Sequence, residues 1–315
     1  MTEQPVFDIL GVGTATIDDF IHVRSYPAPD QKEKILRENR RFGGLVGTAL
    51  AAASRLGSRC GYLGMFGSDE ASLVLVRGLE EAGIDCSLGI RGREVRPIHS
   101  IIVVDESKHT RNIFYTDPVR LMPENDQVEG PVVAQAKILL IDQLGIAAAR
   151  FARRFAIPVV ADMDWAGRDD QQEFMGLADH LILSARFAEQ LTGHRDPIET
   201  VRALHGEKGR RCTAVTYGKH GCYYLSKRNG NRVEHVQALQ IREVETTGCG
   251  DVFHGAYASA LASTNDIAQC LIYATAAASL YAGRPSGWEH LPTGPEVDKL
   301  VGELARRNKL ARRNM

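Results

Sequence analysis

The chain has 315 residues and a mass of 34.6 kDa, which allows one large α/β domain or two small ones. With 44% hydrophobic and 24% charged residues it has the composition of a globular protein, which excludes intrinsic disorder and fibrous architecture. Its formal net charge of −1 argues against a broad binding surface for the phosphate backbone of nucleic acid.

The N-terminal part of the chain alternates strand-like and helix-like segments. The continuous apolar run over residues 6–12 predicts a strand buried on both faces. The polar stretch up to residue 42 contains turn-forming residues and predicts an irregular segment. After it we expect an alanine-rich helix over 45–56, a strand over 60–66, a helix over 69–82, and a hairpin with strands at 99–104 and 111–115.

The alternation continues to the C-terminus. Strands are predicted over 137–142, 157–161, 180–184, 212–218 and 222–226, and helices over 147–156, 185–192, 197–208, 251–263, 266–282 and 295–307. Repeated βαβ units predict an α/β fold with a mostly parallel sheet flanked by helices on both faces. We expect residues 19–42 and 97–116 to leave that sheet and pair into a small lid. No linker marks a boundary, so residues 1–315 are predicted to form a single domain.

Signals for targeting or membrane insertion are absent from the sequence pattern. The N-terminus has no basic start followed by an apolar core, and the longest apolar stretch, 267–282, is too short to span a bilayer. The six cysteines show no zinc-ribbon or dithiol spacing. We therefore expect a cytoplasmic protein with reduced thiols and with neither a membrane nor a nucleic-acid partner.

The segment 245–262 carries the strongest chemical signal. Its apolar residues fall on one helical face from Asp251 onward, so Gly248, Cys249 and Gly250 lead into the helix. Glycines before a helix expose backbone N–H groups where the helix dipole favours an anion. A carboxylate beside such an anion site suits phosphoryl transfer, which needs amides for the developing charge and a base for the attacking hydroxyl. An ordinary helix start with an acidic first turn explains the pattern equally well.

Several segments resemble the ribokinase-like, PfkB family of carbohydrate kinases. Residues 246–257, TTGCGDVFHGAY, resemble the C-terminal signature of that family, and residues 42–57 resemble its N-terminal signature of a Gly-Gly pair and an alanine-rich helix. Residues 13–19, 191–193 and 215–221 match three further landmarks in the same order. Thr48, Ser184 and residues 251–256 are most similar to the sulfofructose-kinase-like branch.

The resemblance implies a role for each matched residue. Asp251 takes the position of the catalytic base, and the backbone at Gly248, Cys249 and Gly250 takes that of the anion hole. The sugar-binding positions are Asp18, Gly43, Gly44 and Thr48, and the nucleotide side is lined by Thr216, Gly218, Gly221 and Ser184. The family's β-sheet lid corresponds to 19–42 and 97–116 and often forms a dimer contact. The implied activity is ATP-dependent phosphorylation of a sugar hydroxyl, with Mg²⁺ as cofactor and a homodimer as the expected assembly.

The sequence departs from the family at the metal site, because the Asn-x-x-Glu motif falls on 184–187 and neither functional residue is kept. We expect Glu245, Asp162 and Asp164 to take over metal handling, the last two because ligands bind at the carboxyl ends of parallel strands. Lys32, on the lid, is a candidate contact for an acidic group on the substrate. A nucleoside kinase and a catalytically weak sugar- or nucleotide-binding protein remain alternatives.

Overall fold

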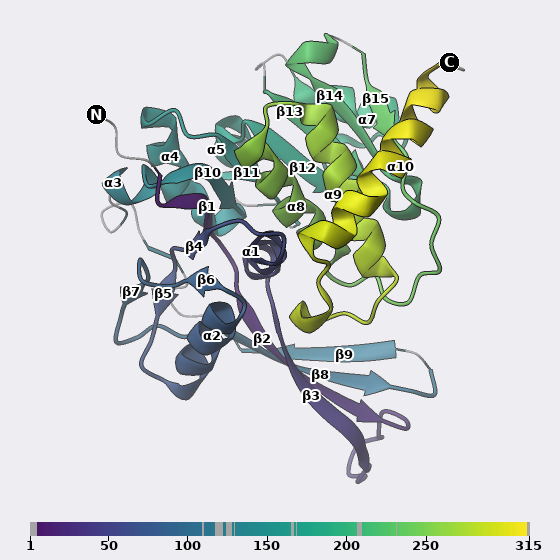
Figure 1. Ribbon diagram of the computed structural model, residues 1–315. Helices are drawn as coiled ribbons and strands as arrows, with labels where there is room; N and C mark the ends of the chain where they lie inside the picture. The colour runs from purple at the N-terminus through teal and green to yellow at the C-terminus, as the bar shows by residue number, and fades with distance from the viewer. Residues whose placement is uncertain are drawn as a thin grey trace.

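The computed structural model describes residues 5–108, 110–116, 122–123, 128, 130–164, 167, 169–206, 210–230 and 232–313, with the backbone alone at 229 and 307–313. Figure 1 shows a large sheet covered by helices, from which a small sheet projects. Within the described residues no helix has the length and the apolarity needed to cross a membrane.

The large sheet has nine strands in the described part of the chain and is mostly parallel, as the sequence predicts. Their spatial order is β15 (Glu234–Val236), β14 (Cys222–Ser226), β13 (Cys212–Thr216), β12 (His180–Ser184), β11 (Val159–Ala161), β10 (Ala136–Ile141), β1 (Phe7–Val12), β4 (Cys60–Tyr62) and β6 (Ile84–Asp85). Only β14 pairs antiparallel with its two neighbours. The carboxyl ends of the parallel strands therefore meet at one edge, where open α/β sheets bind ligands.

Helices cover both faces of this sheet because its central strands bury apolar side chains on both faces. In β10, Ile138 and Leu140 contact one core cluster, whereas Leu139 and Ile141 contact the other. The first cluster is completed by α1 (Leu45–Arg55), α2 (Glu70–Glu81), α8 (Cys249–Ser263), α9 (Ile267–Ala282) and α10 (Gly294–Arg313). The second is completed by α3 (Gly130–Val133), α4 (Ile146–Arg154), α5 (Gln171–Leu177), α6 (Ala185–Thr192) and α7 (Pro197–His205).

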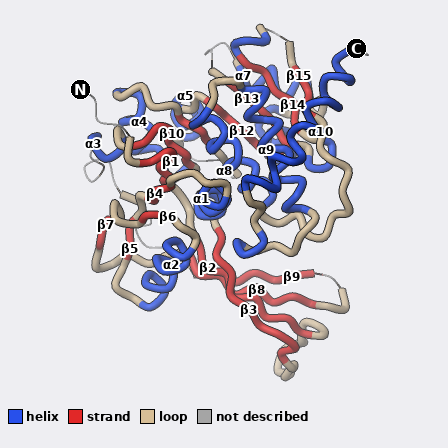
Figure 2. The backbone as a smooth tube through the Cα atoms, in the orientation of Figure 1, coloured by secondary structure: helices blue, strands red, loops and turns tan. Residues whose placement is uncertain are grey.

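The small sheet corrects one prediction. Residues 19–42 are not irregular: most of them form two long strands, β2 (Thr16–Val23) and β3 (Ile35–Gly43), which pair with β8 (Ile98–Asp105) and β9 (Thr110–Tyr115) in the order β3-β2-β8-β9. Their charged residues concealed the strand pattern, because these residues pair across the sheet instead of facing a core. Figure 2 shows the four strands together, apart from the main body.

Two further element boundaries differ from the sequence predictions. Residues 60–66 are not one strand, because the chain leaves the large sheet after β4 and forms β5 (Met65–Phe66), which pairs with β7 (Ile90–Arg91). The helix predicted from Asp251 begins at Cys249 instead, directly after Gly248. Cys249 and Gly250 are therefore part of its first turn.

The helices α1 and α8 lie against each other at the centre of the molecule. A Cβ atom at Gly255 of α8 would lie 2.0 Å from the carbonyl oxygen of Ala49 in α1, so only glycine allows this approach. The contact brings the N-terminus of α8 close to the N-terminus of α1, where the small sheet begins. These two helix starts and the carboxyl ends of β10, β11 and β12 frame the candidate site.

Candidate active site

The start of α8 presents a carboxylate beside backbone N–H groups, of which that of Cys249 donates to the carbonyl oxygen of Thr246 at 3.3 Å. Gly248 is the N-cap and has a φ of 80°, in the left-handed region that glycine adopts without strain. Cys249, Gly250 and Asp251 follow in the first turn, where N–H groups have no acceptor within the helix. Burial raises the pKa of the Cys249 thiol to about 12, so this cysteine stays protonated at neutral pH.

Asp251 is half-buried and stands near three other carboxylates. Burial raises its pKa well above the ordinary value, and the negative charges of Asp162, Asp164 and Asp142 raise it further. A carboxylate with a raised pKa is a stronger base than an ordinary aspartate. The environment of Asp251 therefore suits proton abstraction from a hydroxyl near neutral pH.

His254 connects Asp162 to the first turn of α8. Its Nδ1 atom lies 2.8 Å from the carbonyl oxygen of Gly250 and 3.3 Å from Oδ2 of Asp162, and its Nε2 atom lies 3.0 Å from the carbonyl oxygen of Ile182. The ring is 4% exposed. It thereby holds α8, β11 and β12 in fixed relative positions. The sequence alone indicates only a packed helix residue at position 254. Two of its partners, Asp162 and Ile182, lie far away in the sequence, and the third, Gly250, is one helical turn away.

Asp142 is connected to the start of α1 through Thr14, and it was not identified from the sequence. Its Oδ2 atom accepts hydrogen bonds from the backbone N–H and the hydroxyl of Thr14, at 2.6 and 2.7 Å. Thr14 Oγ1 in turn accepts from the N–H of Leu45, the first residue of α1, at 3.1 Å. Asp142 is fully buried, and burial raises its pKa. Its role is to fix the start of α1.

The predicted sugar-binding residues gather beside the anion site. A Cβ atom at Gly43 would lie 2.6 Å from Oδ2 of Asp18, and Gly44, with a φ of 87°, caps α1. A Cβ atom at Gly248 would lie 3.7 Å from the Thr48 methyl group, which places the anion site directly beside α1. Burial raises the pKa of Asp18, although the hydroxyls of Ser100 and Thr16 lower it in part.

Two predicted site residues are not brought to this group. Lys32 is exposed in the loop between β2 and β3, at the end of the sheet opposite Asp18, which pairs with Arg41 near the other end of both strands. Glu245 is engaged elsewhere: its Oε2 atom accepts from the N–H of Ser286 at 3.0 Å, and its Oε1 atom lies 3.5 Å from Nη1 of Arg41. Glu245 is therefore paired with Ser286 and Arg41, whereas the acids that raise the pKa of Asp251 are Asp162, Asp164 and Asp142.

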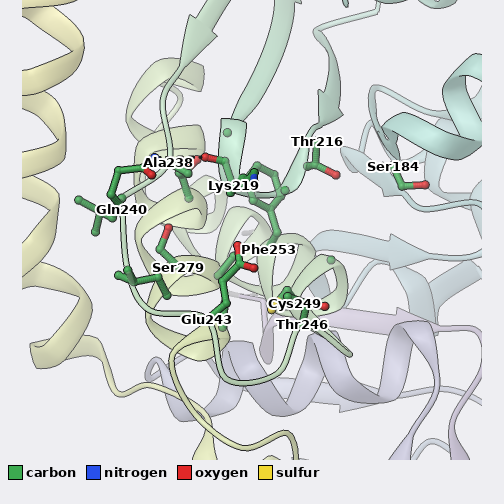
Figure 3. Close-up of a pocket in the computed structure, with 18 residues that line it drawn as sticks. Ser184, Thr216, Lys219, Ala238, Gln240, Glu243, Thr246, Cys249, Phe253 and Ser279 are labelled. Atoms are coloured by element: carbon green, nitrogen blue, oxygen red, sulfur yellow. Dashed lines mark hydrogen bonds between the residues drawn. The ribbon is translucent and has the colours of Figure 1, made fainter. Parts of the chain in front are cut away.

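A cavity of about 520 Å³ lies on the other side of the anion site. Figure 3 shows Ser184, Thr216 and Cys249 at its wall. All four residues predicted for the nucleotide side, Ser184, Thr216, Gly218 and Gly221, line it. Ser184 and Thr216 are register partners at the ends of β12 and β13, which explains why they meet.

The cavity also has a wall that sequence reasoning missed. It comes from the loop 237–248 and from one side of α9, and its polar members are Gln240, Glu243, Thr246, Thr275 and Ser279. A usable signal was present in α9, where Thr275 and Ser279 stand four residues apart within an otherwise apolar helix. The loop offered none, because its residues follow no regular period.

The acids near Asp251 fit a hydrated divalent cation better than a closed metal cage. Among the described residues no group of three His, Cys, Asp or Glu side chains is placed to hold a metal ion. Mg²⁺ keeps several waters when it binds with phosphates, so one or two carboxylates suffice. Asp164 is exposed, and the surrounding protein together with the charges of Asp162 and Asp142 raises its pKa to about 6. A nearby cation would relieve this repulsion.

Comparison with known proteins decides the family. The sequence model described as "pfkB family carbohydrate kinase" matches residues 8–293. The chain belongs to this family. As a pfkB-family carbohydrate kinase it phosphorylates a sugar hydroxyl with ATP.

Individual relatives support this assignment over nearly the whole length of the kinase. It is 23% identical to the 5-dehydro-2-deoxygluconokinase of Bacillus subtilis, with 95% of this chain and 97% of the relative covered. A putative ribokinase from Agrobacterium tumefaciens is 25% identical, with a TM-score of 0.85 and coverage of 95% and 98%. The Arabidopsis thaliana ribokinase complexed with ribose and ATP has a TM-score of 0.81 at 21% identity, with coverage of 95% and 99%. These names support the family, whereas the sulfofructose-kinase-like branch is not shown.

Proposed function

We propose that Asp251 is the general base of this kinase and that the backbone amides at residues 248–250 bind the transferring phosphoryl group. The observation that supports this assignment most is the position of Asp251. It lies in the first turn of α8, directly after Cys249 and Gly250, which line the cavity with Ser184 and Thr216, and after Gly248, which lies next to Thr48 of α1. A nucleotide in the cavity and a sugar beside Asp18 would meet at this helix start.

The proposed reaction is a direct transfer. Asp251 accepts the proton of the sugar hydroxyl while the hydroxyl oxygen attacks the γ-phosphorus of ATP, and ADP leaves with the electron pair of the broken P–O bond. The amides of α8 stabilise the charge on the transferring group. Asp18 and the backbone at Gly43 and Gly44 hold other hydroxyls of the sugar, so that the reacting hydroxyl faces Asp251.

Mg²⁺ is the proposed cofactor, with Asp164 and Asp162 as the residues that would hold it. Held there, the ion would supply positive charge against the charge of the triphosphate. His254 keeps Asp162 oriented toward this position through its contacts with α8 and β12. Glu245 is not part of the proposed metal site, because both of its oxygens have other partners.

The small sheet is the proposed lid and dimer contact. Its strands β8 and β9 expose Ile101, Ile113, Phe114 and Tyr115, and Ile101 and Phe114 are register partners on one face. Apolar side chains gathered on a projecting sheet favour a second copy of the chain as the partner. The requirement for ATP and the six free cysteines support a cytoplasmic location.

The experiment that tests the proposal measures ADP formation over a panel of acceptors: ribose, fructose, 5-dehydro-2-deoxygluconate, sulfofructose and adenosine. We expect one sugar or sugar acid to support turnover at about 1–100 per second, as is typical of kinases. Turnover with adenosine alone would favour a nucleoside kinase. Binding of sugar and ATP without ADP formation would favour the catalytically weak binding protein.

A further inference from the structure

Arg41 reaches from the small sheet to the loop before α8. It lies on β3 opposite Asp18, and both side chains belong to the same face of the sheet. Its Nη1 atom donates a hydrogen bond to the hydroxyl of Ser286 and lies 3.5 Å from Oε1 of Glu245. Its Cζ atom lies 4.6 Å from the centre of the Phe20 ring. The guanidinium group is thus held by the small sheet on one side and by the main body on the other.

Glu245 connects Arg41 to the segment that leads into α8. Its Oε2 atom accepts from the N–H of Ser286 at 3.0 Å, and its own N–H donates to the carbonyl of Ala282 at 3.4 Å. Burial would raise the pKa of Glu245, but the hydrogen bonds from Ser286 and the charge of Arg41 outweigh burial and keep its pKa below the ordinary value. Glu245 is therefore an ionised and immobilised residue, three positions before Gly248.

The turn after α9 completes the connection. The hydroxyl of Tyr281 accepts from the N–H of Gly287 at 2.7 Å, and a Cβ atom at Gly248 would lie 3.6 Å from the Tyr281 ring. Trp288 packs on Phe42 of β3, with 5.5 Å between ring centres, and donates to the Thr48 hydroxyl at 3.1 Å. Tyr281 through Gly287, and Thr48 through Trp288, thus connect Gly248 to the turn that contacts β3.

Arg41 is retained here at a cost in stability. Its side chain is 20% exposed, and its Nε atom is buried with no hydrogen-bond partner among the described residues. A buried donor without a partner destabilises the folded state. Neighbouring Arg40, on the opposite face of β3, instead makes two hydrogen bonds to Asp19, at 2.6 and 2.8 Å. A side chain selected for stability alone would be expected to match Arg40, so the position of Arg41 indicates a functional constraint.

We propose that Arg41 is a positioning residue that couples the position of the small sheet to the geometry of the anion hole. When the sheet stands over the sugar site, Arg41 fixes Glu245 and Ser286, and the loop 245–248 then holds the amides of α8 in place for the transferring phosphoryl group. The inference rests on the proposed function of those amides. It assigns to Arg41 an effect on the rate of transfer and none on the binding of either substrate.

The kinetic test compares Arg41→Met with Arg40→Met, using the panel acceptor with the highest rate. For Arg41→Met we expect kcat to fall by about 10–100-fold, the loss that a misplacement of about 1 Å causes, with KM for sugar and for ATP unchanged. Arg41→Lys keeps the positive charge but loses the planar guanidinium group, so its kcat is expected to lie between those of the wild type and Arg41→Met. Arg40→Met removes an ion pair from the same strand and is expected to keep the wild-type kcat.

A double-mutant cycle with Glu245→Gln tests the path. If Arg41 acts through Glu245, the double variant loses no more rate than Arg41→Met alone. A raised KM for sugar with kcat kept would make Arg41 a substrate contact and overturn the proposal. Equal losses in Arg41→Met and Arg40→Met would also overturn it, because they would reflect general weakening of the sheet. Ser286→Ala replaces Arg41→Met if that variant fails to fold.

A second readout does not depend on activity. In the ligand-free protein, Arg41→Met is expected to speed hydrogen exchange of the amides at 244–250, whereas Arg40→Met is expected to leave it at the wild-type rate. Unchanged exchange in Arg41→Met would contradict the coupling. If the wild type phosphorylates no acceptor but the exchange rates differ as expected, the proposed function fails while the coupling stands.

Discussion

At the scale of single residues, the site is built on unfavourable electrostatics. Asp251, Asp162, Asp142 and Asp164 all have pKa values raised by burial, and the charges of Asp162, Asp164 and Asp142 add to the rise at Asp251. His254, with 3.3 Å between its Nδ1 atom and Oδ2 of Asp162, is the described partner that offsets part of this repulsion. Such a cluster lowers stability for the sake of a basic carboxylate.

The first prediction follows from the raised pKa of Asp251. Replacing Asp251 with Asn removes a partly desolvated charge, so the variant should melt at a higher temperature than the wild type. We expect a rise on the order of 2 °C, because about 1 kcal/mol moves the midpoint of a large domain by that amount. A matched control is Asp266→Asn at the N-cap of α9, where asparagine caps a helix about as well as aspartate, so the melting temperature should not rise.

The difference in melting temperature between Asp251→Asn and the wild type should also depend on pH, in a direction that follows from the raised pKa. A carboxyl whose pKa is higher in the folded state than its ordinary value of 3.8 is protonated in both states at low pH, so wild type and Asp251→Asn should then be equally stable. As pH rises above 3.8, the unfolded wild type gains charge first and the folded state loses relative stability. The gap in melting temperature should therefore widen with pH and level off above the folded pKa. A gap that narrows with rising pH would contradict this account.

The second prediction concerns metal. Asp164→Asn should raise the Mg²⁺ concentration needed for half-maximal rate several-fold, because Asp164 is the exposed carboxylate of the cluster. Glu245→Gln should leave that concentration unchanged even where it lowers the rate, because Arg41 and Ser286 occupy both of its oxygens. A Mg²⁺ titration of both variants distinguishes them. If only Glu245→Gln raised the Mg²⁺ concentration needed for half-maximal rate, Glu245 rather than Asp164 would be the metal ligand.

At the scale of elements, the small sheet and the turn after α9 contact each other beside the candidate site. β2 and β3 carry Asp18 and Arg41, and both lie near the junction with the main body. Lys32 is exposed in the loop at the far end of the sheet, beyond the pairing of Val23 with Ile35. Movement of this sheet would therefore change the surroundings of Asp18 and Arg41 together.

The third prediction is that the small sheet becomes more protected when sugar binds, because closure over the sugar excludes water from the phosphoryl group. Hydrogen exchange of residues 16–43 and 98–116 is measured with and without the best acceptor from the panel. The nine-stranded sheet serves as an internal reference, because its exchange should not change. Equal protection of the small sheet in both states would indicate a rigid flange.

At the scale of the whole molecule, the sequence predicted the architecture well because parallel strands buried on both faces read as continuous apolar runs. β10 and β12 appear in this way almost at their observed limits. In the small sheet, β8 and β9 were predicted as a hairpin, whereas β2 and β3 were not predicted, because charged pairs such as Asp19 with Arg40 hide the alternation. The strand order of the small sheet depends on which strands pair with each other, and no local sequence pattern contains that information.

The candidate site divides in the same manner. Residues within one local motif, such as Gly248, Cys249, Gly250 and Asp251, could be predicted together, because a helix start has its own sequence signal. Asp142, His254 and Arg41 could not, because their partners lie far away in the chain or depend on where an element ends. Glu245 shows the converse, since its place in a motif suggested metal whereas its contacts are with Arg41 and Ser286.

The central claim is that Asp251 takes the proton of the acceptor hydroxyl, and one variant tests it most directly. Asp251→Asn keeps the shape of the side chain but cannot accept the proton. The account predicts that the rate falls by about 10²–10⁴-fold, the usual contribution of a general base, while calorimetry shows an unchanged dissociation constant for the sugar. A variant that keeps more than half of the wild-type turnover would contradict the account.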